Sequence, residues 1–172
     1  GEVMHARAAT GKHRMTLLAA AVDESGNLVL AGILAGVWRM DNTVRFLLEG
    51  DEFVRISFDG ELRPQSFEQI PFPPSFLDTP AATFAPNGDL FLSGVWLETR
   101  TPDAADPRTW ERGLYLGRFD EKGKNVFSRR FDAMAVLSVT QIVSDETGTV
   151  RMMGEAMKSE VPALTGTDSN AL

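Results

Sequence analysis

Cysteine is absent from the 172-residue sequence. Its absence excludes disulfide bonds, thiolate metal sites and a cysteine nucleophile. Histidine is scarce as well, because the chain has only His5 and His13, whose spacing is not typical of a zinc site. The acidic turns that contain Asp23, Asp120 and Asp145 offer two carboxylates each, fewer than a calcium site uses. We therefore predict that the chain binds no metal ion.

Motifs for cofactors and nucleophiles are missing too. The sequence contains no GxxxxGK[ST] phosphate loop, no GxGxxG dinucleotide motif and no GxSxG nucleophile elbow. The glycines are explained by turns instead. We predict a protein that uses no cofactor and is not an enzyme.

Long apolar runs are also lacking. The longest candidate, 17–22, is far shorter than the roughly 20 residues of a membrane-spanning helix, so we predict no transmembrane segment. The net charge of −7 repels a phosphate backbone, so we predict no nucleic-acid partner. Apolar residues nevertheless make up 43% of the chain, which is enough for a hydrophobic core.

A repeat is what the sequence does have. Three stretches share one pattern, in which a short apolar segment, a polar turn with a glycine, and a second apolar segment ending in glycine follow one another. They read VDESGNLVLAG at 22–32, FAPNGDLFLSG at 84–94 and VSDETGTVRMMG at 143–154. Each predicts a β-hairpin whose turn glycine takes a positive φ.

A second motif with the same period lies between these hairpins. It reads FVRISFDG at 53–60 and LYLGRFDEKG at 114–123, with the Phe-Asp pairs 61 residues apart. One period of about 61 residues therefore holds two hairpins, or four antiparallel strands. This predicts an all-β fold of propeller-like four-stranded antiparallel blades. Another antiparallel fold, such as a sandwich, is the alternative.

These stretches resemble a known family. The hairpin motif at 21–32 and 83–94, followed by the Phe-Asp motif at 52–60 and 113–123, is similar to the bacterial SBBP (seven-bladed β-propeller) repeats and the related delta-60 repeats. The resemblance covers most of 17–155 and departs at 95–112 and 152–153. It implies a propeller fold and an extracellular, periplasmic or cell-surface location, and it implies no particular activity.

The repeat also predicts how the chain is divided. We expect the last strand of a preceding blade at 1–16, a blade at 17–67, a connection at 68–80, a blade with an inserted loop 95–112 at 81–131, the first hairpin of a further blade at 137–158, and a polar tail or linker at 159–172. This amounts to about two and a half to three blades. Closed propellers use four to eight, so we expect a partial propeller of a longer chain or a subunit that forms a ring. A domain that caps its own edges is the alternative.

Binding residues are expected in the long connections 33–43, 68–80 and 95–112. All three tryptophans fall there, with nearby arginines and phenylalanines, and such residues are enriched at binding hot spots. The predicted binding residues are Trp38, Arg39, Phe72, Phe76, Trp96, Arg100, Arg108 and Trp110. The alternative interpretation is that these aromatics cover the core between blades.

The resulting functional hypothesis is a non-catalytic repeat module for protein–protein interaction or structural scaffolding, with a protein partner or self-association. The alternative is a carbohydrate-binding or carbohydrate-processing propeller fragment whose loop face is lined by tryptophans. Sugar stacking on exposed indole rings would separate the two.

Overall fold

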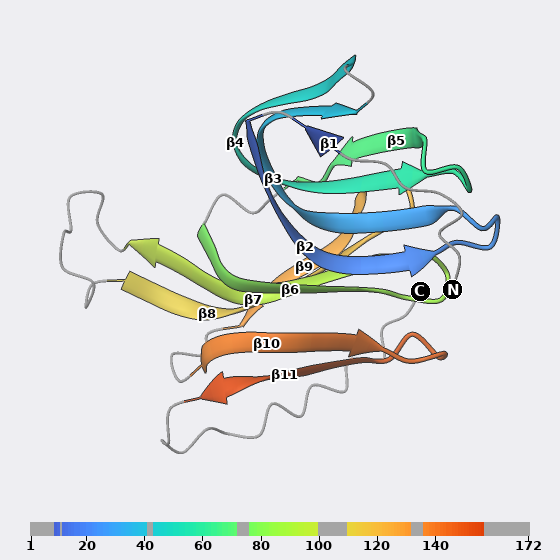
Figure 1. Cartoon of the computed structure of the whole chain (residues 1–172). Helices are drawn as coiled ribbons and strands as arrows, with labels where there is room; N and C mark the ends of the chain where they lie inside the picture. Colours follow the sequence, from blue (N-terminus) through green and yellow to red (C-terminus); the bar gives the residue numbers. More distant parts are fainter. Residues whose placement is uncertain are drawn as a thin grey trace.

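The computed structural model describes residues 9–10, 12–40, 43–71, 76–99, 110–131 and 136–156. In this part of the chain all regular structure is β, in antiparallel sheets, and no helix is present (Figure 1). The all-β, antiparallel part of the predicted fold is therefore confirmed. The strands are β1 (Ala9–Thr10), β2 (His13–Val22), β3 (Leu28–Met40), β4 (Thr43–Phe58), β5 (Pro64–Gln69), β6 (Phe76–Phe84), β7 (Leu90–Thr99), β8 (Trp110–Phe119), β9 (Asn125–Phe131), β10 (Val136–Ser144) and β11 (Val150–Ala156).

The strands form three sheets in chain order. In sheet A, β3 pairs with β4 and β4 with β5, while β1 and β2 both pair with the other edge of β3. Sheet B is a four-stranded meander, β6-β7-β8-β9, and sheet C is the hairpin β10-β11. The three sheets do not close into a ring within the described residues.

Successive sheets stack through their first strands. Strand β2 contacts β6, and β6 contacts β10. Two cross-sheet hydrogen bonds support this stacking: the backbone N–H of Val139 donates to Thr79 Oγ1 at 3.2 Å, and Arg55 Nη1 donates to the carbonyl oxygen of Asp120, also at 3.2 Å. The turns that follow β2, β6 and β10 are therefore brought to one end of the molecule.

Sheet B is covered on both faces, because alternate residues of a strand point to opposite sides. Leu90 and Leu92 face sheet A, whereas Phe91, between them, faces sheet C. The core between A and B contains Ala31, Phe53, Ile70, Ala82, Leu90, Leu92, Trp96, Tyr115 and Phe119. The core between B and C contains Ala81, Ala85, Phe91, Leu114, Val139 and Ile142.

Sheet A buries its second face by bending. Leu34, Trp38, Val54, Ile56 and Phe58 form a third core whose partners all come from β2, β3, β4 and β5. Figure 1 shows β3 and β4 curving over at one end. The β3–β4 pairing has register shifts on both sides of Val37, and Gly36 takes a positive φ of 85°. Such β-bulges increase the bend of a strand.

Two of the predicted long connections contain strand. Residues 33–40 belong to β3, and 95–99 and 110–112 belong to β7 and β8. The prediction failed because residues 33–38 and 95–97 are apolar at consecutive positions, so they lack the polar–apolar alternation of a half-buried strand. The third connection, 68–80, is shorter than predicted, because β5 extends to Gln69 and β6 begins at Phe76.

The hairpin turns share one geometry. In four of them an aspartate begins the turn, and its Oδ1 accepts the backbone N–H groups two and four residues later at 2.8–3.0 Å. The residue three positions after the aspartate takes a positive φ. It is Gly26, Gly123 or Gly148 in three of the turns, as the sequence predicts.

The fourth aspartate turn breaks this rule, because Leu62 occupies the glycine position with a φ of 60°. A side chain there costs about 1–2 kcal/mol. We expect Leu62→Gly to raise the free energy of unfolding by about 0.5 kcal/mol, since glycine's larger entropy in the unfolded chain offsets part of the gain. Urea denaturation measures it.

The matched control is Gly26→Ala in the equivalent turn. Nothing lies within 4 Å of a Cβ added there, so only the backbone conformation changes. We expect a loss of about 1 kcal/mol. A loss on Leu62→Gly together with no change on Gly26→Ala would contradict the turn geometry.

Candidate functional site

An open groove lies at the end where the turns of the three sheets meet. Its volume is about 1180 Å³. The lining residues come from the turns after β2, β6, β8 and β10 and from the ends of the neighbouring strands. They are Ala21, Val22, Asp23, Glu24, Ser25, Val29, Arg55, Phe84, Ala85, Pro86, Asn87, Gly88, Glu121, Ser144, Asp145, Glu146 and Thr147.

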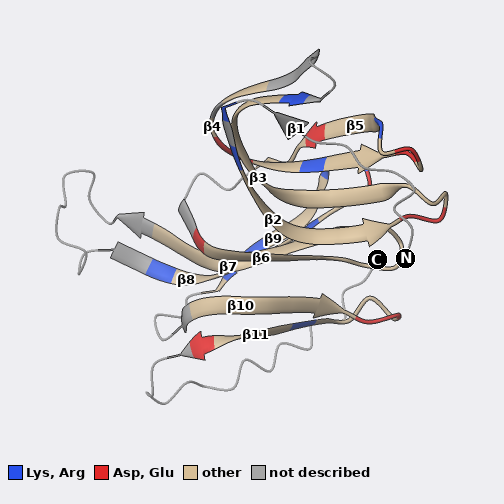
Figure 2. Cartoon of the chain, in the orientation of Figure 1, with Lys and Arg blue, Asp and Glu red and all other residues tan. Residues whose placement is uncertain are grey.

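The rim of this groove is acidic. Sheet A contributes Asp23 and Glu24, sheet B contributes Glu121, and sheet C contributes Asp145 and Glu146. Figure 2 shows acidic turns at this end of sheets A and C. Arg55 is the one cationic side chain among the described lining residues. Carboxylates gathered around a concave surface produce a negative potential that attracts cationic groups.

Two of the rim carboxylates are held by their own turns. Hydrogen bonds from the backbone N–H and side chain of Asn27 lower the pKa of Asp23. The hydroxyl of Thr147, followed by backbone N–H groups, lowers the pKa of Asp145. Hydrogen bonds to a carboxylate favour its charged form, so both groups stay ionised at neutral pH. The turn sequence thus fixes negative charges at the rim.

The floor of the groove contains a buried cation. Arg55 lies in β4 and is 8% exposed. Its guanidinium carbon is 5.8 Å from the centroid of the Phe84 ring, and its Nη1 donates to the carbonyl oxygen of Asp120. Within the described part of the chain, no carboxylate forms an ion pair with it. The charge of Arg55 helps to lower the pKa of Asp23, but it is the smallest of the contributions to that shift.

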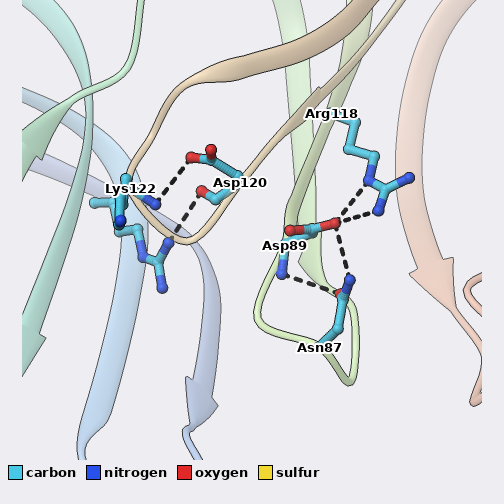
Figure 3. A network of polar contacts seen from close by, with 6 residues as sticks. Asn87, Asp89, Arg118, Asp120 and Lys122 are labelled. Atoms are coloured by element: carbon cyan, nitrogen blue, oxygen red, sulfur yellow. Dashed lines mark hydrogen bonds and ion pairs between the residues drawn. The ribbon is translucent and has the colours of Figure 1, made fainter.

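A neighbouring arginine shows the contrast (Figure 3). Arg118 Nε donates to Asp89 Oδ2 at 2.7 Å, and the same oxygen accepts from Asn87 Nδ2 at 3.0 Å. Asn87 in turn accepts the backbone N–H of Asp89 at 3.2 Å. Arg118 is thus neutralised inside the protein, whereas Arg55 opens onto the groove without a counter-ion from the described residues.

The residues predicted from sequence do not gather at this groove. Trp38 and Trp96 were expected in loops, but they lie in β3 and β7 and are buried, at 3% and 4% exposure. The Trp38 ring packs edge-on against Phe58, with centroids 6.3 Å apart. For these two tryptophans the predicted loop location is wrong, because the strands extend through both positions and their side chains are buried. Trp96 lies in the core between sheets A and B, whereas Trp38 lies in the core within sheet A.

The other predicted residues are placed only in part. Arg39 is an exposed residue of β3, and Phe76 and Trp110 begin β6 and β8, with side chains outside the described set. Phe72, Arg100 and Arg108 lie outside the described residues altogether. Of the eight, only Trp38, Arg39 and Trp96 have described side chains, and these three do not line the groove. The carboxylates of the rim are visible in the sequence as acidic turn residues, but the turn pattern alone does not predict that they meet at one groove.

The described residues contain neither a metal-binding cluster nor a membrane-spanning helix. No cluster of three or more His, Cys, Asp or Glu side chains there could hold a metal ion. No helix among those residues is both long and apolar enough to cross a membrane. The carboxylates of the rim come from separate turns, and together they make the groove negatively charged.

Comparison with known proteins adds no family. No protein-family model matches the chain, and no curated protein matches its sequence. The resemblance to SBBP and delta-60 repeats therefore remains a prediction that rests on the residues quoted above.

Proposed function

We propose that the chain is a non-catalytic protein-interaction module built on propeller-type blades, and that its groove binds a basic segment of a partner. The observation that carries this proposal is the acidic rim: five carboxylates from three sheets surround one open groove. Complementary charge gives an interface its specificity and speeds association. The net charge of −7 also favours a basic partner.

The propeller part of the proposal is supported by the arrangement of the sheets. Three antiparallel sheets stack in chain order through β2, β6 and β10, and sheet B is a four-stranded meander of the kind found in a blade. We propose an extracellular, periplasmic or cell-surface location on the sequence resemblance alone.

Carbohydrate binding is the weaker proposal. Sugars stack on exposed aromatic rings, and two of the three tryptophans are buried in the core. Among the described residues that line the groove, Phe84 is the single aromatic, and it already packs beneath Arg55. The groove therefore offers charges rather than a stacking platform.

Fluorescence anisotropy tests the proposed function. A fluorescein-labelled peptide of alternating Lys and Gly should bind, the corresponding Glu-Gly peptide should not, and binding should weaken as NaCl screens the charges. The triple variant Glu24→Gln/Glu121→Gln/Glu146→Gln should lower the affinity about tenfold. These three side chains take no part in the hydrogen bonds that form the aspartate turns.

The matched control removes the same number of charges elsewhere. The residues changed in Glu52→Gln/Glu61→Gln/Glu155→Gln do not line the groove, so this variant should leave the affinity nearly unchanged. An equal loss in both triple variants would mean attraction by net charge, and no loss in the rim variant would mean another site. Either result would overturn the groove as the binding site.

A further inference from the structure

We propose that Arg55 forms a carboxylate-binding subsite at the floor of the groove, so that the partner segment carries a carboxylate flanked by basic side chains. This rests on the proposed function and adds what the groove selects.

The repeat shows that the fold does not need a charge at position 55. The Phe-Asp motifs are 61 residues apart, and the residue that corresponds to Arg55 in the next repeat is Leu116. Leu116 is half-buried and packs against the core between sheets B and C. Arg55 lies in the equivalent strand of sheet A, on the side that faces sheet B. One repeat thus has a guanidinium where the other has an ordinary apolar side chain.

A buried guanidinium without a counter-ion is costly. Arginine is almost never fully buried unless it is paired, because its charge loses hydration. Arg55 has five N–H donors, and the structure gives it one hydrogen bond, to the carbonyl oxygen of Asp120. Arg55 lines the groove, so an anion bound there could accept from its remaining donors and compensate the lost hydration.

The surroundings hold the guanidinium ready for a planar anion. The Phe84 ring lies beneath it, and the Asp120 carbonyl fixes one of its nitrogens. A guanidinium fixed in this way can present two parallel N–H groups to a carboxylate, and such charge-assisted pairs are the stronger hydrogen bonds. The floor therefore matches a carboxylate in geometry as well as in charge.

The rim excludes a simple anion. Asp23, Glu24, Glu121, Asp145 and Glu146 surround the entrance and repel an isolated carboxylate. A ligand that carries cations on both sides of its carboxylate satisfies the rim and the floor together. A peptide segment with an Asp or Glu side chain, or a carboxyl terminus, next to Lys or Arg has this pattern.

Three peptides test the inference on the wild-type protein by fluorescence anisotropy. All three are Lys-Gly peptides. The first has a central Glu and an amidated C-terminus, and the second has a central Gln and an amidated C-terminus. The third has a central Gln and a free C-terminal carboxylate. We expect the Glu peptide, or the free-carboxylate peptide, to bind about tenfold more tightly than the amidated Gln peptide. The better binder identifies the source of the carboxylate.

Two variants assign this preference to Arg55. Arg55→Leu introduces the residue that the repeat uses at 116, so we expect a folded protein that binds all three peptides equally and at the affinity of the Gln peptide. Arg55→Lys keeps the charge without the planar donor pair and should retain only part of the preference. Circular dichroism and thermal denaturation check the folding of both.

The outcomes separate the two proposals. If wild-type protein binds all three peptides with equal affinity, the Arg55 subsite is overturned while the acidic groove stands. If it binds none of them, the proposed function itself fails. If Arg55→Leu is folded and still prefers the carboxylate peptide, the subsite lies elsewhere and the inference is overturned.

Discussion

Replacing Trp96 by alanine is expected to lower the free energy of unfolding by about 3–5 kcal/mol. The side chain is 4% exposed in the core between sheets A and B, and the guanidinium carbon of Arg130 lies 5.3 Å from its ring centroid. Removing the indole leaves a cavity where the two sheets meet. Since domains are stable by about 5–15 kcal/mol, the loss is a large fraction of the total. Urea denaturation followed by circular dichroism measures it.

A control variant separates burial from side-chain size. Leu47 is a large apolar residue of β4 that is 70% exposed, and we expect Leu47→Ala to change stability by less than about 0.5 kcal/mol. If Trp96→Ala were equally harmless, the indole would be free to contact a ligand, and the loop-face hypothesis would be restored for this residue.

The second large effect is expected at Gly32. A Cβ added there would lie 3.1 Å from the carbonyl carbon of Thr16 and closer still to its oxygen. That carbonyl belongs to the backbone of β2, beside a register shift in the β2–β3 pairing, so it cannot swing away like a side chain. Gly32→Ala should therefore cost about 3 kcal/mol. Gly154, at the equivalent position of sheet C, faces the Ser138 carbonyl in the same way.

Gly50 provides the matched comparison for the glycine variant. It lies in β4 and has nothing within 4 Å of an added Cβ. Gly50→Ala should leave stability unchanged or raise it slightly, because alanine has less conformational entropy to lose on folding. Equal denaturation midpoints for Gly32→Ala and the wild type would show that β2 and β3 do not approach each other as closely as the structure has them.

The sequence predicted the hairpins well because their signals are local. An aspartate followed three residues later by glycine marks the turn, and the structure gives Gly26, Gly123 and Gly148 the positive φ that such a turn needs. The second glycine of the motif also belongs to the repeat. Its reason, the close approach of the preceding strand at Gly32 and Gly154, depends on the pairing and could not be seen in the sequence.

The length of the strands was harder to predict. Residues such as 90–92 are apolar on consecutive positions, since sheet B has a neighbour on each face. The polar–apolar alternation that reveals a half-buried strand is absent there. For the same reason the sequence pattern places Trp38 and Trp96 in loops, whereas they lie in β3 and β7. Burial between layers is a property of the stacking, which a local pattern does not contain.

The candidate site was missed for the same physical reason. Its carboxylates lie at 23–24, 121 and 145–146, in turns far apart along the chain, and the stacking of the sheets through β2, β6 and β10 brings those turns together. Arg55 is visible in the sequence as a cation in the apolar stretch FVRISF. Its burial and the lack of an internal counter-ion required the structure.

The most direct test of the acidic groove is chemical-shift mapping of the isotope-labelled protein with the Lys-Gly peptide that carries a central Glu. The account predicts that the largest backbone amide shifts occur at 23–25, 85, 87–88, 121 and 144–147, and that the Arg55 side-chain resonances move with them. Shifts confined to the opposite ends of the hairpins, near 36–40 and 97–99, would contradict it and would return the search to the loop face.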